Sequence, residues 1–294
     1  MKYVVTGSLG NISKPLAEQL VKAGHEVVVV SSNNDKTAQI EAIGAKAAIG
    51  SVDDVAFLTK TFSGADAVYT MVPPNFAAEN YREFYNVAAN AYATAIKATE
   101  VKRVVNLSSI GAHLSEDTGP IKGLHDLENI FNKLEGVNIK HLRAAAFYTN
   151  YLASIGMIKH AGILGDNYGS DTPIILVHPK DIATAVVEEL ENGFTGKSVR
   201  YVVSDELTPK EATAILGKAI GKPELPWVEF SDADALAGML QAGLPEEIAK
   251  NFVEMGVAVR AGKLKEDFDN HKPIALAKTK LTDFAVEFAA AYNA

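Results

Sequence analysis

Short apolar runs alternate with amphipathic stretches along the first half of the chain. Runs rich in Val, Ile and Ala with little polar interruption are typical of strands buried on both faces of a sheet. Strands are therefore predicted at residues 3–6, 27–30, 45–49, 65–72, 101–107 and 137–142. Stretches with apolar residues three and four positions apart predict helices around residues 16–21, 36–43, 57–62, 77–99 and 124–134. Because parallel neighbours need a crossover helix, the alternation predicts an α/β fold with a doubly wound parallel sheet of the Rossmann type.

The alternation weakens beyond about residue 144. A helix is expected at residues 148–157, a strand at 174–177, a helix opened by Pro179 and a strand at 198–203. The remainder is predicted to be mostly helical, with a capping box beginning at Thr208 and another helix start at Pro245. We therefore expect a dinucleotide-binding Rossmann core in residues 1–150. Residues 151–294 are expected to form a small, mostly helical substrate and cap region interwoven with that core.

A glycine turn joins the first predicted strand to the first helix. Gly7 permits a sharp turn and Gly10 a close approach of the backbone to phosphate, whereas Ser13 stands where a third glycine would allow close packing. Free N–H groups and the positive end of the helix dipole favour an anion, so the pyrophosphate of a dinucleotide is the expected ligand. The candidate cofactor contacts in this turn are Gly7, Ser8, Leu9, Gly10, Asn11 and Ile12.

Composition excludes several kinds of function. The net charge is −8 and the basic residues are scattered, so direct binding to nucleic acid is not expected. The chain has no cysteine, so it forms no disulfides, and any redox chemistry must come from a bound cofactor. No apolar run approaches the roughly 20 residues that span a bilayer, and no signal peptide is recognisable. We expect a cytoplasmic protein with no membrane partner. No metal site is expected, because acidic residues and histidines do not stand at ligand spacing.

The end of the second strand is where a dinucleotide-binding fold reads the adenine ribose. An acidic residue there repels the 2′-phosphate of NADP, but this chain has Ser31, Ser32 and Asn33, and no carboxylate before Asp35. Hydroxyl and amide groups can hydrogen-bond that phosphate. We therefore predict NADP as the cofactor, with NAD as the alternative, since no arginine is present and a plain polar turn suits either.

Ligands of open α/β sheets bind at the carboxyl ends of the strands, and three further groups of residues stand at such ends. The candidates are Met71, Val72 and Pro73 after the fourth strand, Ser108 and Ser109 after the fifth, and Phe147 and Asn150 after the sixth. The alternatives are a strand stop at the prolines and turn or helix capping by the serines. His113 and His125 border the polar loop after the fifth strand, where a surface or capping role is the ordinary one.

These motifs, in their order and spacing, resemble the NmrA-like branch of the atypical short-chain dehydrogenases/reductases. The resemblance covers essentially the whole chain and rests on the sequences Gly7-x-x-Gly10, Leu107-Ser108-Ser109, Leu142-Arg143, Val177-His178-Pro179-x-Asp181-Ile182-Ala183 and Arg260-Ala261-Gly262. It implies binding of NAD(P). It also implies one of two functional kinds, either NAD(P)H-dependent reductases, some acting on quinones, or cofactor-binding regulators with little turnover.

Reductases of the wider superfamily carry a Tyr-x-x-x-Lys pair, and this chain departs from that pattern. The matching place, residues 120–124, has neither tyrosine nor lysine in register. The expected reaction is therefore direct hydride transfer from NADPH to a quinone-like or other small conjugated acceptor that needs no strong general acid. The alternatives are a non-catalytic NAD(P) sensor and, less in keeping with the missing pair, a sugar-nucleotide isomerase or lyase. No catalytic residue is assigned, and the oligomeric state stays open, a homo-oligomer included.

Overall fold

The computed structural model describes residues 1–294, and the chain forms two compact units. The first unit consists of Met1–Ser109, Gly123–Arg143 and Ile182–Arg200. The second consists of Ile110–Lys122, Ala144–Asp181 and Tyr201–Ala294. Each unit thus collects segments that are far apart in the sequence.

A seven-stranded sheet organises the first unit, and the prediction of a doubly wound parallel sheet is confirmed. The strand order is β10-β6-β5-β4-β1-β2-β3. The strands are β1 (Lys2–Val5), β2 (Glu26–Ser31), β3 (Lys46–Ile49), β4 (Ala67–Thr70), β5 (Arg103–Ser109), β6 (Asn138–Ala144) and β10 (Lys197–Val202). The strand predicted at 198–203 is therefore the seventh member of this sheet. The order reverses between β1 and β4, which is the switch point where such sheets bind their ligands.

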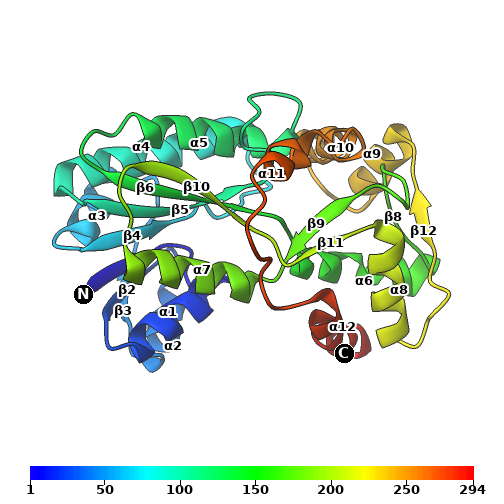
Figure 1. The fold of residues 1–294 in the computed structure, drawn as a ribbon, viewed down its shortest axis with the longest axis horizontal. Coiled ribbons are helices and arrows are strands. Elements are labelled where there is room, and N and C mark those ends of the chain that lie inside the picture. Colours follow the sequence, from blue (N-terminus) through cyan, green and yellow to red (C-terminus); the bar gives the residue numbers. More distant parts are fainter. The chain divides into compact units, whose positions relative to one another are not determined.

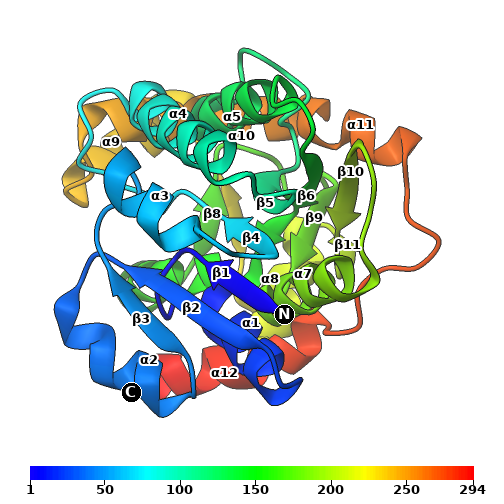
Figure 2. The same cartoon turned by 90° about the vertical axis from the view of Figure 1, so that its left-hand side faces the viewer.

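Helices cover both faces of this sheet. Figures 1 and 2 show α3, α4 and α5 on one face and α1, α2 and α7 on the other. Their bounds are α1 (Ser13–Lys22), α2 (Thr37–Ala42), α3 (Val55–Phe62), α4 (Tyr81–Thr99), α5 (Lys122–Asn132) and α7 (Pro179–Asn192), with a 3-10 turn η1 (Asn34–Lys36) before α2. Val4, Val29, Val68 and Val104 are buried to 2% exposure or less in the middle of the sheet. Burial on both faces explains why these strands were readable as continuous apolar runs.

The second unit has short strands and most of the remaining helices. A three-stranded sheet has the order β11-β9-β7, and β12 pairs with β8. These strands are β7 (Ala146–Phe147), β8 (Leu164–Asp166), β9 (Ile174–Val177), β11 (Asp205–Leu207) and β12 (Trp227–Glu229). The helical elements are η2 (Gly119–Ile121), η3 (Tyr148–Ser154), α6 (Ile155–Ala161), α8 (Pro209–Ala219), α9 (Asp232–Gln241), α10 (Glu246–Arg260), η4 (Lys263–Lys265), α11 (Glu266–Asn270) and α12 (Leu281–Asn293). No helix of the chain is long and apolar enough to cross a bilayer.

The last helix completes the core of the second unit. Leu281, Phe284 and Phe288 on α12 are at most 1% exposed and pack in one cluster with Tyr148 of η3 and Leu216 of α8. The helix expected at residues 148–157 is instead a 3-10 turn followed by α6. The prediction of a single helix was wrong because the apolar spacing of so short a segment suits a 3-10 helix as well as an α-helix.

Candidate functional site

The turn after β1 is as sharp as Gly7 predicted. Gly7 has a φ of +96° and Ser8 a φ of +56°, and the N–H of Gly10 donates to the carbonyl of Gly7 at 3.2 Å. A Cβ on Gly7 would lie 2.5 Å from Oγ of Ser13 and 2.8 Å from Sδ of Met71. Only glycine therefore fits at position 7, both for its backbone conformation and for its space.

The start of α1 leaves backbone donors without acceptors. Ile12 occupies the N-cap position and provides no side-chain cap. The N–H groups of Leu9, Asn11 and Ile12 donate no hydrogen bond within the chain. Unpaired N–H groups at the positive end of a helix are the recurring site for phosphate groups in proteins. The turn therefore fits the pyrophosphate of a dinucleotide.

Ser13 takes the place of the third glycine without separating helix from strand. Its side chain is 2% exposed, and its hydroxyl donates to the carbonyl of Thr6 at 2.7 Å. The close packing that a third glycine gives is thus kept, because the hydroxyl forms a hydrogen bond with the neighbouring backbone. The turn therefore keeps close packing of helix and strand with two glycines instead of three.

The three residues at the end of β2 differ in their exposure and in their hydrogen bonds. Ser31 is 3% exposed, and its hydroxyl donates to the carbonyl of Asn33 while accepting from the hydroxyl of Ser8 at 3.0 Å. Ser32 and Asn33 are exposed, and the Asn33 side chain accepts from the N–H of Asp35 at 2.8 Å. The Ser31 side chain therefore links the end of β2 to the glycine turn after β1. The Ser32 hydroxyl is the one that remains accessible to a ligand.

The end of β4 lies beside the same turn. Sδ of Met71 approaches Gly7, the N–H of Met71 donates to Oγ1 of Thr6 at 2.8 Å, and its carbonyl accepts from the hydroxyl of Tyr92 at 2.7 Å. Val72 is buried and Pro73 is half-buried. Thr6 and Tyr92 were missed by the sequence reasoning. A polar residue at the end of a buried strand was the signal that could have found Thr6.

Ser108 at the end of β5 belongs to a buried ionic group. Its hydroxyl donates to Oε1 of Glu128 on α5 at 2.5 Å. Arg143 on β6 donates to both oxygens of Glu128, at 3.0 and 2.7 Å. Ser108, Glu128 and Arg143 are all at most 8% exposed. A buried carboxylate needs such partners, so the serine hydroxyl is held by the protein itself, while Ser109 beside it stays half-buried.

Two predicted residues, Phe147 and Asn150, belong to the second unit. Phe147 is half-buried on β7, and Asn150 is exposed on η3. Their assignment to the nicotinamide side stays a prediction. In the first unit, Nε2 of His125 lies 2.8 Å from Nδ2 of Asn129, one turn later on α5.

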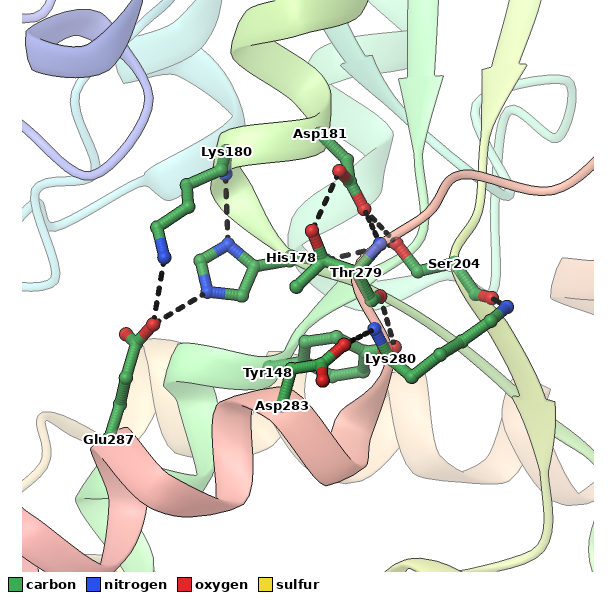
Figure 3. A network of polar contacts seen from close by, with 9 residues as sticks. All are labelled: Tyr148, His178, Lys180, Asp181, Ser204, Thr279, Lys280, Asp283 and Glu287. Carbon is green, nitrogen blue, oxygen red and sulfur yellow. Dashed lines mark hydrogen bonds and ion pairs between the residues drawn. The ribbon is translucent and has the colours of Figure 1, made fainter.

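The His178-Pro179-x-Asp181 segment has a structural place in the second unit, as Figure 3 shows. His178 is 3% exposed, its Nδ1 accepts from the N–H of Lys180 at 3.0 Å, and its Nε2 lies 3.4 Å from Glu287 on α12. Burial lowers the pKa of His178. The Asp181 carboxylate accepts from the N–H and hydroxyl of Thr279 at 3.0 and 2.9 Å. The segment therefore has a structural role, because its side chains bind α12 and the residues just before that helix.

The parallel sheet, its switch point and the glycine turn define a dinucleotide-binding α/β protein. Residues 7–147 match the NAD(P)H-binding family model, so this segment of the chain is similar to that family. This match confirms that the resemblance noted in the sequence correctly predicted an NAD(P)H-binding segment.

Characterised relatives match nearly the whole chain at low identity. A (4-alkanoyl-5-oxo-2,5-dihydrofuran-3-yl)methyl phosphate reductase of Streptomyces griseus is 25% identical over 260 residues, covering 88% of this chain and 87% of the relative. Quinone oxidoreductase 2 of Escherichia coli is 26% identical over 272 residues, 90% of each chain. A crystal structure of an NADPH-dependent quinone oxidoreductase of Escherichia coli with NADPH superimposes with a TM-score of 0.82 at 21% identity, covering 97% of this chain and 99% of that one. These distant homologues are NAD(P)H-dependent reductases.

Proposed function

We propose that this chain is an NADPH-dependent oxidoreductase that passes hydride directly to a quinone-like or other small conjugated acceptor. Support comes from the dinucleotide turn of the first unit and from the two relatives, which are named for the reduction of a quinone and of the phosphate ester of a conjugated furanone. When bound, NADPH supplies the hydride. The free N–H groups of Leu9, Asn11 and Ile12 would hold its pyrophosphate, and the exposed Ser32 hydroxyl would hydrogen-bond its 2′-phosphate.

The observation that carries the choice of acceptor is the state of the side chains where the wider superfamily has its Tyr-x-x-x-Lys pair. No tyrosine occurs between residues 93 and 147. Lys122, the only lysine of the 110–132 stretch, is ion-paired with Glu254 at 2.9 Å, and the Ser108 hydroxyl is bound to Glu128. A simple ketone needs a proton as its alkoxide forms, whereas a quinone takes hydride to give a stabilised anion. An easily reduced conjugated acceptor therefore suits this chain.

The test is steady-state oxidation of NADPH and of NADH with a panel of benzoquinones, naphthoquinones and simple ketones. We expect turnover with quinones, little with ketones, and slower oxidation of NADPH that carries deuterium at the transferred position. Absence of turnover with every quinone would overturn the proposal.

The same engaged residues favour a second candidate, a non-catalytic NAD(P) sensor. Such a protein needs the turn and no acid. It predicts tight cofactor binding without turnover, together with a partner protein that is retained only in the presence or only in the absence of NADPH. Affinity purification with and without NADPH separates the two candidates.

A further inference from the structure

One residue of the glycine turn has a backbone conformation that its side chain disfavours. Ser8 has a φ of +56°, in the left-handed region where a Cβ crowds the following carbonyl. The other two non-glycine residues with positive φ have ordinary reasons, because Glu100 ends α4 and aspartate, as at Asp117, visits this region readily. Neither reason applies to Ser8. Backbone strain of this kind persists only where the surroundings enforce it, and it collects at binding sites.

Two hydrogen bonds to β2 hold Ser8 in this conformation. Its N–H donates to the carbonyl of Val30 at 2.9 Å, and its hydroxyl donates to Oγ of Ser31 at 3.0 Å. The strands β1 and β2 are parallel neighbours with Val5 opposite Val29, so their carboxyl ends lie side by side (Figure 2). The end of β2 therefore enforces the conformation of the turn that follows β1.

Ser31 is a fixed anchor whose hydroxyl has no capacity left for a ligand. The residue is buried, and its carbonyl accepts from the N–H of Gly50 at 2.9 Å, just after β3. Its Oγ accepts from the Ser8 hydroxyl and from the N–H of Asn33, and it donates to the Asn33 carbonyl, the last two at 3.2 Å. A hydroxyl has one hydrogen and two lone pairs, so these three bonds use all of them. The Ser31 side chain is therefore bound within the protein at the place where a ribose contact was expected.

We propose that Ser31 is a positioning residue for the dinucleotide and that it acts through Ser8, without touching the cofactor. Holding Ser8 in the left-handed conformation fixes the path of the next residues. The free N–H groups of Leu9, Asn11 and Ile12 are then aimed at the pyrophosphate before it binds. A preformed site binds more tightly, because the ligand does not have to order it. This inference rests on the cofactor binding of the proposed function and not on hydride transfer.

The pyrophosphate is common to NADPH and NADH, so loss of the Ser31 hydroxyl should weaken both cofactors by the same factor. Ser31→Ala should bind each about three- to tenfold more weakly, the effect of one lost hydrogen bond, with the NADPH to NADH ratio unchanged. Isothermal titration with both cofactors measures this. Ser63→Ala is the matched control and should bind like the wild type, because it removes an exposed hydroxyl of the first unit that donates to the Thr59 carbonyl at 2.8 Å.

The variant Ser8→Gly tests whether the effect passes through residue 8. Glycine adopts the left-handed conformation without strain and has no hydroxyl for Ser31 to bind. Adding Ser31→Ala to Ser8→Gly should therefore weaken either cofactor by less than about twofold relative to Ser8→Gly alone. An equal loss in both backgrounds would overturn the inference, because Ser31 would then act on the cofactor directly or through Asn33. A changed NADPH to NADH ratio in Ser31→Ala would overturn it as well.

A measurement on the protein without cofactor separates this inference from the proposed function. The amides of Ser8 and Gly10 are hydrogen-bonded at the turn, so their hydrogen exchange reports how firmly the turn is held. Exchange should be several-fold faster in Ser31→Ala and unchanged in Ser63→Ala, and equal exchange in wild type and Ser31→Ala contradicts the inference. Cofactor binding that follows the expected pattern without NADPH oxidation leaves the role of Ser31 standing and removes the reductase activity. Quinone turnover with unchanged cofactor affinity in Ser31→Ala leaves the activity standing and removes the role of Ser31.

Discussion

At the scale of single residues, the nucleotide turn depends on which positions admit a side chain. Gly7 admits none, because its φ is positive and Ser13 and Met71 lie against it. Gly10 has an ordinary φ, and a Cβ there would have one close contact, with the Gly7 carbonyl oxygen at 3.1 Å, which a shift of a few tenths of an ångström relieves. Position 10 is therefore the place where a substitution can reach the ligand without breaking the fold.

Gly10→Val should abolish NADPH binding while leaving the thermal stability close to that of the wild type. The branched side chain would occupy the space through which phosphate approaches the free N–H groups. Isothermal titration with NADPH measures the binding and circular dichroism the fold. Gly238→Val, on a helix with open space around it, is the control and should bind normally. Binding of NADPH to Gly10→Val within a few-fold of wild type would place the phosphate elsewhere.

Ser32→Asp should shift cofactor preference from NADPH toward NADH. A carboxylate on the exposed residue at the end of β2 repels a 2′-phosphate and accepts from the two ribose hydroxyls of NADH, so NADPH should weaken about tenfold or more. The neutral variant Ser32→Asn is the control for shape. Ser31 is a poorer position, because its hydroxyl already joins Ser8 and Asn33. An unchanged NADPH to NADH ratio in titrations of Ser32→Asp would contradict the NADP assignment.

At the scale of elements, a buried ion pair joins α5 to β6. Glu128→Gln or Arg143→Met leaves its partner charged, buried and unpaired, and each should cost about 3–5 kcal/mol of the free energy of unfolding. The double variant should cost less than the sum of the two, since neither charge remains. Urea unfolding of the four proteins measures this coupling. Strict additivity would show that the pair does not act as a unit.

A second buried group on β6 makes stability depend on pH. His141 is 1% exposed between Asn106 and Asn132, and burial lowers its pKa from 6.5 to about 4, with smaller effects from Glu128, Arg143 and Lys197. The unfolded chain therefore binds a proton more readily than the folded one, and stability is lost as the pH falls from about 6.5 toward 4.

The expected size of this loss is about 2 kcal/mol between pH 7 and pH 5. The variant His141→Gln lacks the titrating group, so its stability should change less over the same interval by that amount. Denaturant unfolding of both proteins at the two pH values measures the difference. An equal pH dependence in the two proteins would mean that His141 is as readily protonated in the folded state as in the unfolded chain.

At the scale of the whole molecule, the second unit depends on a helix far along the chain. Phe288 is fully buried in its core, and Phe288→Ala should lower the stability of this unit by about 3–5 kcal/mol. Trp227 lies in the same unit, so its fluorescence follows the transition directly. Val286→Ala, on the exposed side of α12, is the control and should leave the midpoint nearly unchanged. A midpoint shift no larger for Phe288→Ala than for Val286→Ala would contradict this account.

The sequence predicted the large sheet and missed most of the small ones for a physical reason. Strands buried on both faces are continuous apolar runs, whereas β7, β8, β11 and β12 have two or three residues and show no period. In the site, Gly7 and Gly10 were readable because their role is local. The roles of Ser31 and Ser108 were not, because Ser8 and Glu128, which bind their hydroxyls, come from other elements.

The place of α12 in the second unit also sets an order of events during synthesis. The strands β1 to β6 have all been synthesised by residue 144 and can assemble once they leave the ribosome, with β10 joining later at the edge. The core around Tyr148 and Leu216 must wait for Leu281, Phe284 and Phe288. During that interval these apolar side chains lack their cover, the state in which nascent chains aggregate or engage chaperones. Slow translation between residues 220 and 280 would therefore lengthen the time the protein spends at risk.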